Sequence, residues 1–190
     1  MKNKTWWIGL MALGILAQWW VPGQMIWQQE RLFIEGTAFK FKTAPVDPYD
    51  PFRGKYIWLD FEASDFDLPE PAAFEYDEEV FVTVENDTAG YARVSAVTRA
   101  EPLNTEHYFK ANVSTSSNRN STSVGLRFPF GNFYMEESKA YEAEVLHREA
   151  ARDTASVTYA LVFIKNGRSG LANVFVDDVP IRDVVLRNRP

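Results

Sequence analysis

An uncharged stretch near the N-terminus restricts the architecture of this chain more than any other segment. Residues 5–27 contain no charged side chain over 23 positions. A helix that rises about 1.5 Å per residue crosses the hydrocarbon layer of a membrane with about 20 residues, so this stretch is long enough. Tryptophan favours the lipid–water interface and marks both ends of the stretch, at Trp6, Trp7, Trp19, Trp20 and Trp27. The pattern predicts an N-terminal signal-anchor transmembrane helix over residues 1–27.

The charges around this stretch predict its orientation. Lys2 and Lys4 precede it, and an excess of basic residues is typical of the cytoplasmic side of a membrane. We therefore expect a single-pass protein of the inner (cytoplasmic) membrane, with a cytoplasmic N-terminus and an extracytoplasmic domain over residues 28–190. The alternative is a cleaved signal peptide, which would need a small-residue cleavage site before a polar mature start. The sequence contains no convincing site of that kind.

The composition excludes several classes of function. The chain has a formal net charge of −6, and once Lys2 and Lys4 are set aside, 18 basic residues face 26 acidic residues. Nucleic acid and anionic lipid headgroups repel such a domain on average. The absence of cysteine excludes disulfides and thiolate metal sites, and two histidines are too few for a His-rich zinc site. We therefore expect no metal and no cofactor.

The chain beyond residue 28 has the pattern of a β-rich domain. Alternation of apolar and polar residues, or runs of aromatic and β-branched residues, indicate strands. These patterns occur at residues 32–43, 56–61, 79–84, 91–97, 126–135, 156–165 and 170–176. Residues 136–152 contain strong helix formers without proline or glycine and predict one helix. The expected fold class is mainly β (α+β).

Two predicted hairpins resemble each other at a constant offset of 80 residues. Residues 82–94 and 162–174 share five of thirteen residues, including the asparagines at 86 and 166 and the glycines at 90 and 170. This similarity is consistent with a tandem duplication of a β unit, with repeat halves at 32–112 and 124–190. The alternative is that hairpins share residues because turns demand the same chemistry. In a duplicated protein, a cleft between the two units would be the natural ligand site.

The segment Arg53–Phe61 contains a more specific pattern than any periodicity, in the order RGKYIWLDF. It resembles the signature of the GDYXXLXY family, which is named for that motif. Gly54, Tyr56 and Leu59 match the signature, whereas a lysine replaces its acidic residue and a phenylalanine replaces its final tyrosine. Residues 45–53 are similar to the family's lead-in to the motif, and residues 133–137 with Glu144 are similar to a second family segment.

The resemblance implies a membrane-anchored envelope protein of unassigned activity, with a β-rich fold and an integral membrane protein as partner. It also draws attention to two regions as a binding face. The candidate binding residues are Asp47, Asp50, Arg53, Gly54, Tyr56, Leu59, Glu137 and Glu144. Turn formation explains most of the residue types in the first region equally well, since aspartate, proline and glycine favour turns.

Three functions remain open from the sequence. The first is an accessory or interaction protein that acts with an integral membrane partner. The second is an extracytoplasmic ligand-binding domain with a cleft between two β units. The third is a carboxylate enzyme that uses Glu137 and Glu144. We favour a protein without enzymatic activity, because neither a G-x-S-x-G motif nor a phosphate-binding glycine loop occurs.

Overall fold

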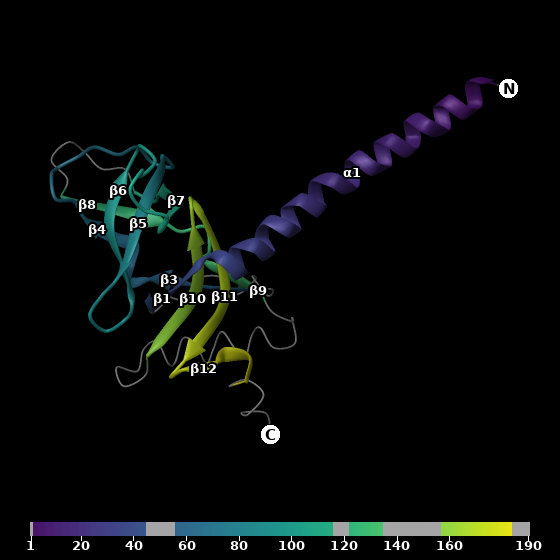
Figure 1. Ribbon diagram of the computed structural model, residues 1–190. Coiled ribbons are helices and arrows are strands. Elements are labelled where there is room, and N and C mark those ends of the chain that lie inside the picture. Colours follow the sequence, from purple (N-terminus) through teal and green to yellow (C-terminus); the bar gives the residue numbers. More distant parts are fainter. Residues whose placement is uncertain (1, 45–55, 116–121, 135–156, 184–190) are drawn as a thin grey trace.

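The computed structural model describes residues 2–44, 56–115, 122–134 and 157–183 (Figure 1). A long N-terminal helix, α1 (Lys2–Glu35), leads into a β-rich domain. Helix α1 projects away from the strands and meets them only at its C-terminal end (Figure 1). The predicted helix over residues 136–152 lies outside the described residues.

Helix α1 differs from the predicted membrane segment. It continues through Pro22 to Glu35, so residues 32–35, which the alternation placed in a strand, are helical. Within the described part of the chain, no helix combines the length and the apolar character needed to cross a membrane. This finding contradicts the predicted transmembrane helix over residues 1–27. The physical reason is composition, because the tryptophans, glutamines and glycines of the uncharged stretch are less hydrophobic than leucine or isoleucine.

The strands form two five-stranded antiparallel sheets and one two-stranded sheet. The first sheet has the order β12-β11-β10-β1-β3, from Val179–Pro180, Arg168–Val176, Thr158–Lys165, Thr37–Ala44 and Asp60–Phe61. The second has the order β4-β8-β7-β5-β6, from Asp65–Asp67, Ser123–Arg127, Tyr108–Val113, Glu79–Asn86 and Ala92–Thr98. The third pairs β2 (Tyr56–Trp58) with β9 (Asn132–Tyr134), and the short helix η1 (Glu62–Ser64) joins β3 to β4. The predicted mainly β class is confirmed.

One hydrophobic core joins the two large sheets. Strand β1 shows how the alternation produces it, because Phe39 and Phe41 are buried while Lys40 is exposed. At the centre of the core, the ring of Phe41 lies 5.1–6.2 Å, between ring centroids, from the rings of Phe61, Phe109, Phe128 and Phe130. Strand β5 adds Val80, Val82 and Val84, all buried. The period-two pattern of the sequence therefore encodes the inner faces of both sheets.

Each sheet combines strands from both predicted repeat halves. Strands β1 and β3, from residues 32–112, pair in one sheet with β10, β11 and β12. The two aligned hairpins also turn differently: Gly90 has a φ of 84° in the first, whereas Asn166 and Gly167, with φ values of 47° and 79°, form the turn of the second. Gly170, the counterpart of Gly90, lies within β11. The tandem duplication stays a prediction.

The C-terminal end of α1 packs against β10 and β11. Leu32 is buried, and the ring of Phe33 meets that of Phe163 edge-on at 5.6 Å between centroids. Lys165 Nζ donates to Glu35 Oε2 at 3.2 Å. A Cβ atom on Gly170 would lie 2.7 Å from Gln29 Nε2 and 3.2 Å from both Leu32 Cδ2 and Phe33 Cζ. A side chain at position 170 would therefore press on Gln29, Leu32 and Phe33 of the helix.

The phenol of Tyr159 provides a pH test of the packing of the first sheet. Burial, and next the hydrogen bond that its hydroxyl donates to Asp178 Oδ1, raise the pKa of Tyr159 to about 12. The unfolded chain releases this proton at about pH 10, so the stabilisation is fully present below that pH. It is lost as the pH rises from about 10 to about 12, because the folded protein then keeps a proton that the unfolded chain has released.

We expect Tyr159→Phe to flatten the fall in the free energy of unfolding between about pH 10 and about pH 12, as measured by urea unfolding. The control is Leu103→Ala, at an apolar side chain that is 95% exposed and does not titrate, which should leave the slope unchanged. An equal slope in Tyr159→Phe and the unmodified protein would show that this phenol does not link pH to stability.

Candidate functional site

The family-like motif crosses from one sheet to another. Its residues 56–58 form β2, which pairs with β9 so that Tyr56 lies opposite Tyr134 and Ile57 opposite Phe133. Its residues 60–61 form β3, which pairs with β1 in the first sheet. Between the two strands, the backbone N–H of Leu59 donates to Gly131 O at 2.7 Å. The described ends of the two regions singled out from the sequence, at Tyr56 and at Phe133 and Tyr134, are therefore neighbours in the structure.

Two motif side chains belong to the hydrophobic core. Leu59 and Phe61 are only 2% and 3% exposed. The ring of Phe61 packs against those of Phe41, Phe128 and Phe130, with centroid distances of 5.3–5.9 Å. The apolar positions of the motif thus stabilise the junction between the sheets. Asp60, the residue between them, points away from the core and is exposed.

The structure describes two of the eight candidate binding residues. Tyr56 lies in β2, and Leu59 lies in the core beside the β8–β9 connection. The other six lie outside the described residues: Asp47, Asp50, Arg53, Gly54, Glu137 and Glu144. The carboxylate pair considered for an enzyme is therefore not placed.

A cleft of about 500 Å³ opens beside the motif. It lies where the end of the first sheet meets β4, β7 and β8 of the second. Its lining combines core side chains with polar ones from five segments: Leu59, Asp60, Phe61, Ser64, Asp65, Asn112, Ser114, Leu126, Arg127, Phe128, Pro129, Gly131 and Asn132. Only Leu59 among these was expected at a site, because the polar members come from positions that are distant in sequence and follow no motif.

Hydrogen bonds hold the polar rim of the cleft. Asp60 Oδ1 accepts from the backbone N–H of Phe61 at 2.9 Å and from Ser64 Oγ at 3.4 Å. The guanidinium of Arg127 pairs with Asp77. A hydrogen bond with Tyr76, followed by the charge of Asp77, raises the pKa of Arg127 above its usual range, so this side chain stays cationic.

One buried acceptor at the cleft has no partner. Asn132 Oδ1 is shielded from solvent and has no hydrogen-bond partner in the structure. Asn132 belongs to β9 and lies opposite Trp58 of the motif strand β2. Buried polar atoms are nearly always paired in folded proteins, so an unpaired one beside a cleft marks a place where a ligand or water could donate.

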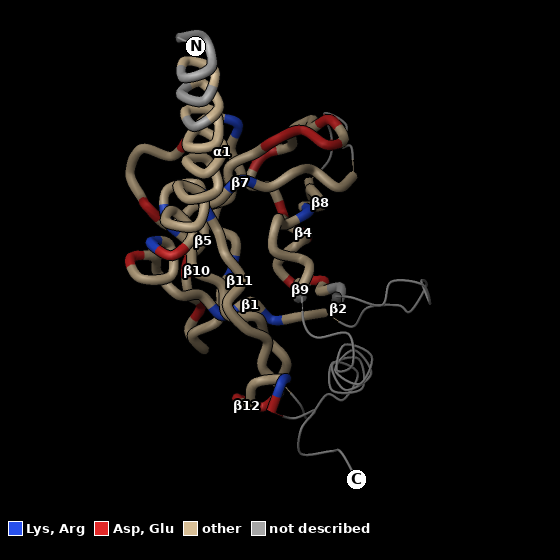
Figure 2. The backbone as a smooth tube through the Cα atoms, turned by 90° about the vertical axis from the view of Figure 1, so that its right-hand side faces the viewer, with Lys and Arg blue, Asp and Glu red and all other residues tan. Residues whose placement is uncertain are grey.

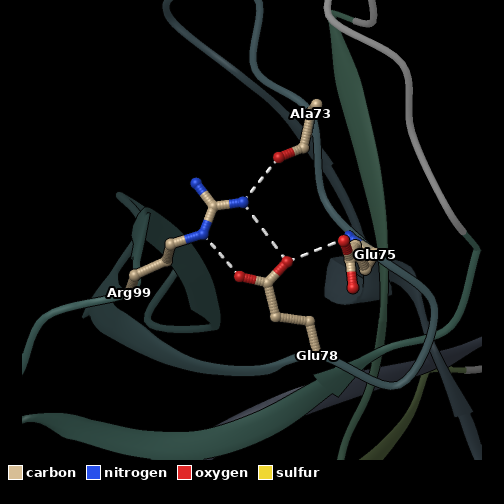
Figure 3. A network of polar contacts seen from close by, with 4 residues as sticks. All are labelled: Ala73, Glu75, Glu78 and Arg99. Atoms are coloured by element: carbon tan, nitrogen blue, oxygen red, sulfur yellow. Dashed lines mark hydrogen bonds and ion pairs between the residues drawn. The ribbon is translucent and has the colours of Figure 1, made fainter.

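A second polar cluster holds the segment between β4 and β5 (Figure 3). Arg99 Nε donates to Glu78 Oε1 at 2.5 Å, and Arg99 Nη2 donates to Ala73 O at 2.5 Å and to Glu78 Oε2 at 3.2 Å. The backbone N–H of Glu75 donates to Glu78 Oε2 at 2.9 Å. The hydrogen bond from Arg99 is the main cause that lowers the pKa of Glu78. These contacts tie a loop to the end of β6, which explains the cluster without any chemistry on a ligand.

Metal chemistry finds no support in the described ranges. Within residues 2–44, 56–115, 122–134 and 157–183, no three acidic or histidine side chains are grouped so that they could hold a metal ion. His107 is engaged with Thr37 Oγ1 at 3.1 Å and packs edge-on against Phe39. The imidazole thus helps to connect β1 with β7.

Comparison with known proteins gives one match. Residues 18–174 match the family described as GDYXXLXY protein. This range includes the second half of α1 and nearly all of the strands, through most of β11. No curated protein matches the chain significantly, and neither does any solved structure.

Proposed function

The chain belongs to the GDYXXLXY family, and on that premise we propose that it is a membrane-associated accessory protein that acts with an integral membrane partner. Helix α1 binds that partner, and the β-rich domain is the interaction module. The single observation that carries the proposal is the apolar surface of α1 between Trp6 and Trp27, whose described side chains are exposed.

Between Trp6 and Trp27, the described apolar side chains of α1 are exposed, and they lie on more than one side of the helix. Trp6 and Trp7 are 71% and 70% exposed, and Trp19 and Trp20 are 75% and 73% exposed. Successive residues point about 100° apart on a helix, so these neighbouring pairs do not form a single stripe. Exposed apolar side chains on several sides of a helix are stabilised when an apolar environment surrounds them. Helices of a membrane protein supply such an environment, whereas a soluble partner would cover one face.

The distribution of charged residues also supports separate roles for α1 and the β-rich domain. They lie on the β-rich domain and at the C-terminal end of α1 (Figure 2), and none occurs between Lys4 and Glu30. We propose that the protein resides at the inner membrane with its β-rich domain on the extracytoplasmic side. Protease added to spheroplasts should cleave the domain, and protection from cleavage would contradict this placement.

Affinity capture of the full-length protein from detergent-solubilised membranes tests the proposal. We expect a stoichiometric multi-spanning membrane protein to co-purify, identified by mass spectrometry. The double variant Trp19→Gln/Trp20→Gln should lose it, because two exposed apolar contacts are replaced by polar ones. Leu103→Gln, at a residue that is 95% exposed on the β-rich domain, is the matched control and should retain it. Recovery of the protein alone, or equal capture by both variants, would overturn the proposal.

A further inference from the structure

The cleft beside the motif has the dimensions and the lining of a small-molecule site. Its volume of about 500 Å³ lies within the usual range of such sites. Buried side chains such as Phe61 and Phe128 form an apolar base, and polar side chains from both large sheets surround it. An apolar surface with a few placed polar groups is typical of ligand sites. This inference is independent of the proposed membrane partner.

The charge of the cleft is negative. Asp60 and Asp65 both line it and both are exposed. Among the ion pairs of the described residues, neither carboxylate is paired with a lysine or arginine. Arg127, the one cation in the lining, pairs with Asp77 outside it. A cleft with unpaired carboxylates attracts cations and repels anions.

Oxygen atoms that can accept hydrogen bonds also line the cleft. Asn132 Oδ1 is a buried acceptor without a partner. Three side-chain oxygens converge over Gly125: the position of an added Cβ would be 2.6 Å from Ser114 Oγ, 3.5 Å from Asp65 Oδ1 and 3.6 Å from Thr115 Oγ1. The absence of a side chain at Gly125 keeps this group of oxygens open. A ligand that complements the cleft must therefore bring several N–H or O–H donors.

We propose that this cleft binds a small organic amine. Its ammonium groups donate to the carboxylates of Asp60 and Asp65, and its carbon chain lies on the apolar base beside Leu59 and Pro129. An ammonium supplies a positive charge and several N–H donors, which the two carboxylates accept. A neutral sugar would supply donors without charge, and an anion would meet two unpaired carboxylates.

Isothermal titration of the full-length protein in detergent micelles with spermidine tests the proposal. We expect saturable one-site binding that Asp60→Asn/Asp65→Asn weakens by about tenfold or more, since each carboxylate contributes a charge-assisted hydrogen bond. Asparagine keeps the shape and the acceptor oxygen, so the hydrogen bond from the Phe61 backbone can remain. The matched control is Glu62→Gln/Asp67→Asn, which removes the same charge at neighbouring positions outside the lining.

The outcomes distinguish amine binding in the cleft from attraction of the amine to negative charge on the protein surface. Equal loss of affinity in the two double variants, absence of spermidine binding, or tighter binding of glucose than of spermidine would each overturn the proposal. A second readout does not depend on the variants. In the unmodified protein, spermidine should shift the amide resonances of Gly125 and Asn132 and leave that of Gly90 in place. Shifts confined to other regions would place the amine elsewhere and contradict the assignment.

Discussion

Replacing Phe41 with alanine is expected to lower the free energy of unfolding by about 3–5 kcal/mol, the usual cost of deleting a buried aromatic ring. Phe41 is fully buried in β1. Its ring contacts four other phenylalanine rings that come from β3, β7 and the β8–β9 connection. Both large sheets therefore lose contacts at once. The missing ring leaves a cavity between them, and neither sheet can shift to fill it without breaking hydrogen bonds between its own strands.

Urea unfolding followed by tryptophan fluorescence and far-UV circular dichroism measures this effect. Leu103→Ala is the matched control, because this large apolar side chain is 95% exposed and its removal should change stability by less than about 0.5 kcal/mol. A loss below about 1 kcal/mol for Phe41→Ala would contradict a shared core, since truncation of a large core side chain to alanine costs about 2 kcal/mol or more. The cleft should be affected as well, because Phe61 and Phe128 of its base rest on Phe41.

Gly170→Leu is expected to detach the C-terminal end of α1 from the β-rich domain. The added side chain would overlap Gln29, Leu32 and Phe33 on the helix. Gly170 lies inside β11 without a positive φ, so the effect comes from the lack of space and not from backbone strain. We expect a loss of about 1–3 kcal/mol from overpacking. The orientation of the helix relative to the strands should become variable.

Spin labels measure this orientation directly, because the chain contains no cysteine of its own. Labels at Gln18→Cys in α1 and Ser95→Cys in β6 should give one narrow distance distribution, which Gly170→Leu broadens. The matched control is Gly14→Leu, at a helical glycine with nothing within 4 Å of an added Cβ. An unchanged distribution in Gly170→Leu would show that the helix is not held by this contact. Under the proposed function, the same variant should also reduce capture of the membrane partner.

Local patterns in the sequence predict much of the β-rich domain. The alternation in residues 38–42 places Phe39 and Phe41 inside and Lys40 outside, as the structure has them. The motif is informative for a similar reason, since Leu59 and Phe61 are two apart and both enter the core. The same alternation is misleading at residues 32–35, where Leu32 and Phe33 belong to the last turn of α1. Leu32 and Phe33 can be buried by a strand or by the end of a helix, and the pattern of apolar residues does not distinguish the two structures.

Local sequence patterns predict little of the candidate site. Tyr56 and Leu59 were found because they belong to a motif, whereas Asp60, Asp65 and Asn132 carry no local signal. They meet because β4 pairs with β8 and β2 pairs with β9, across long separations in the sequence. Exposed polar residues are not restricted by core packing, so their partners cannot be read from the alternation of apolar positions.

The amino-acid sequence by itself determined the mainly β class, the inner faces of the strands, the family and the long uncharged stretch. These properties depend on residues close together in the chain, through the period of a strand or the order of a motif. Tertiary structure alone decided which strands pair, that α1 docks where Gly170 leaves room, and that polar residues of β7, β8 and β9 line one cleft with Asp60 and Asp65. Pairing between distant strands is settled by how all buried side chains fill the shared core together, which no single segment specifies.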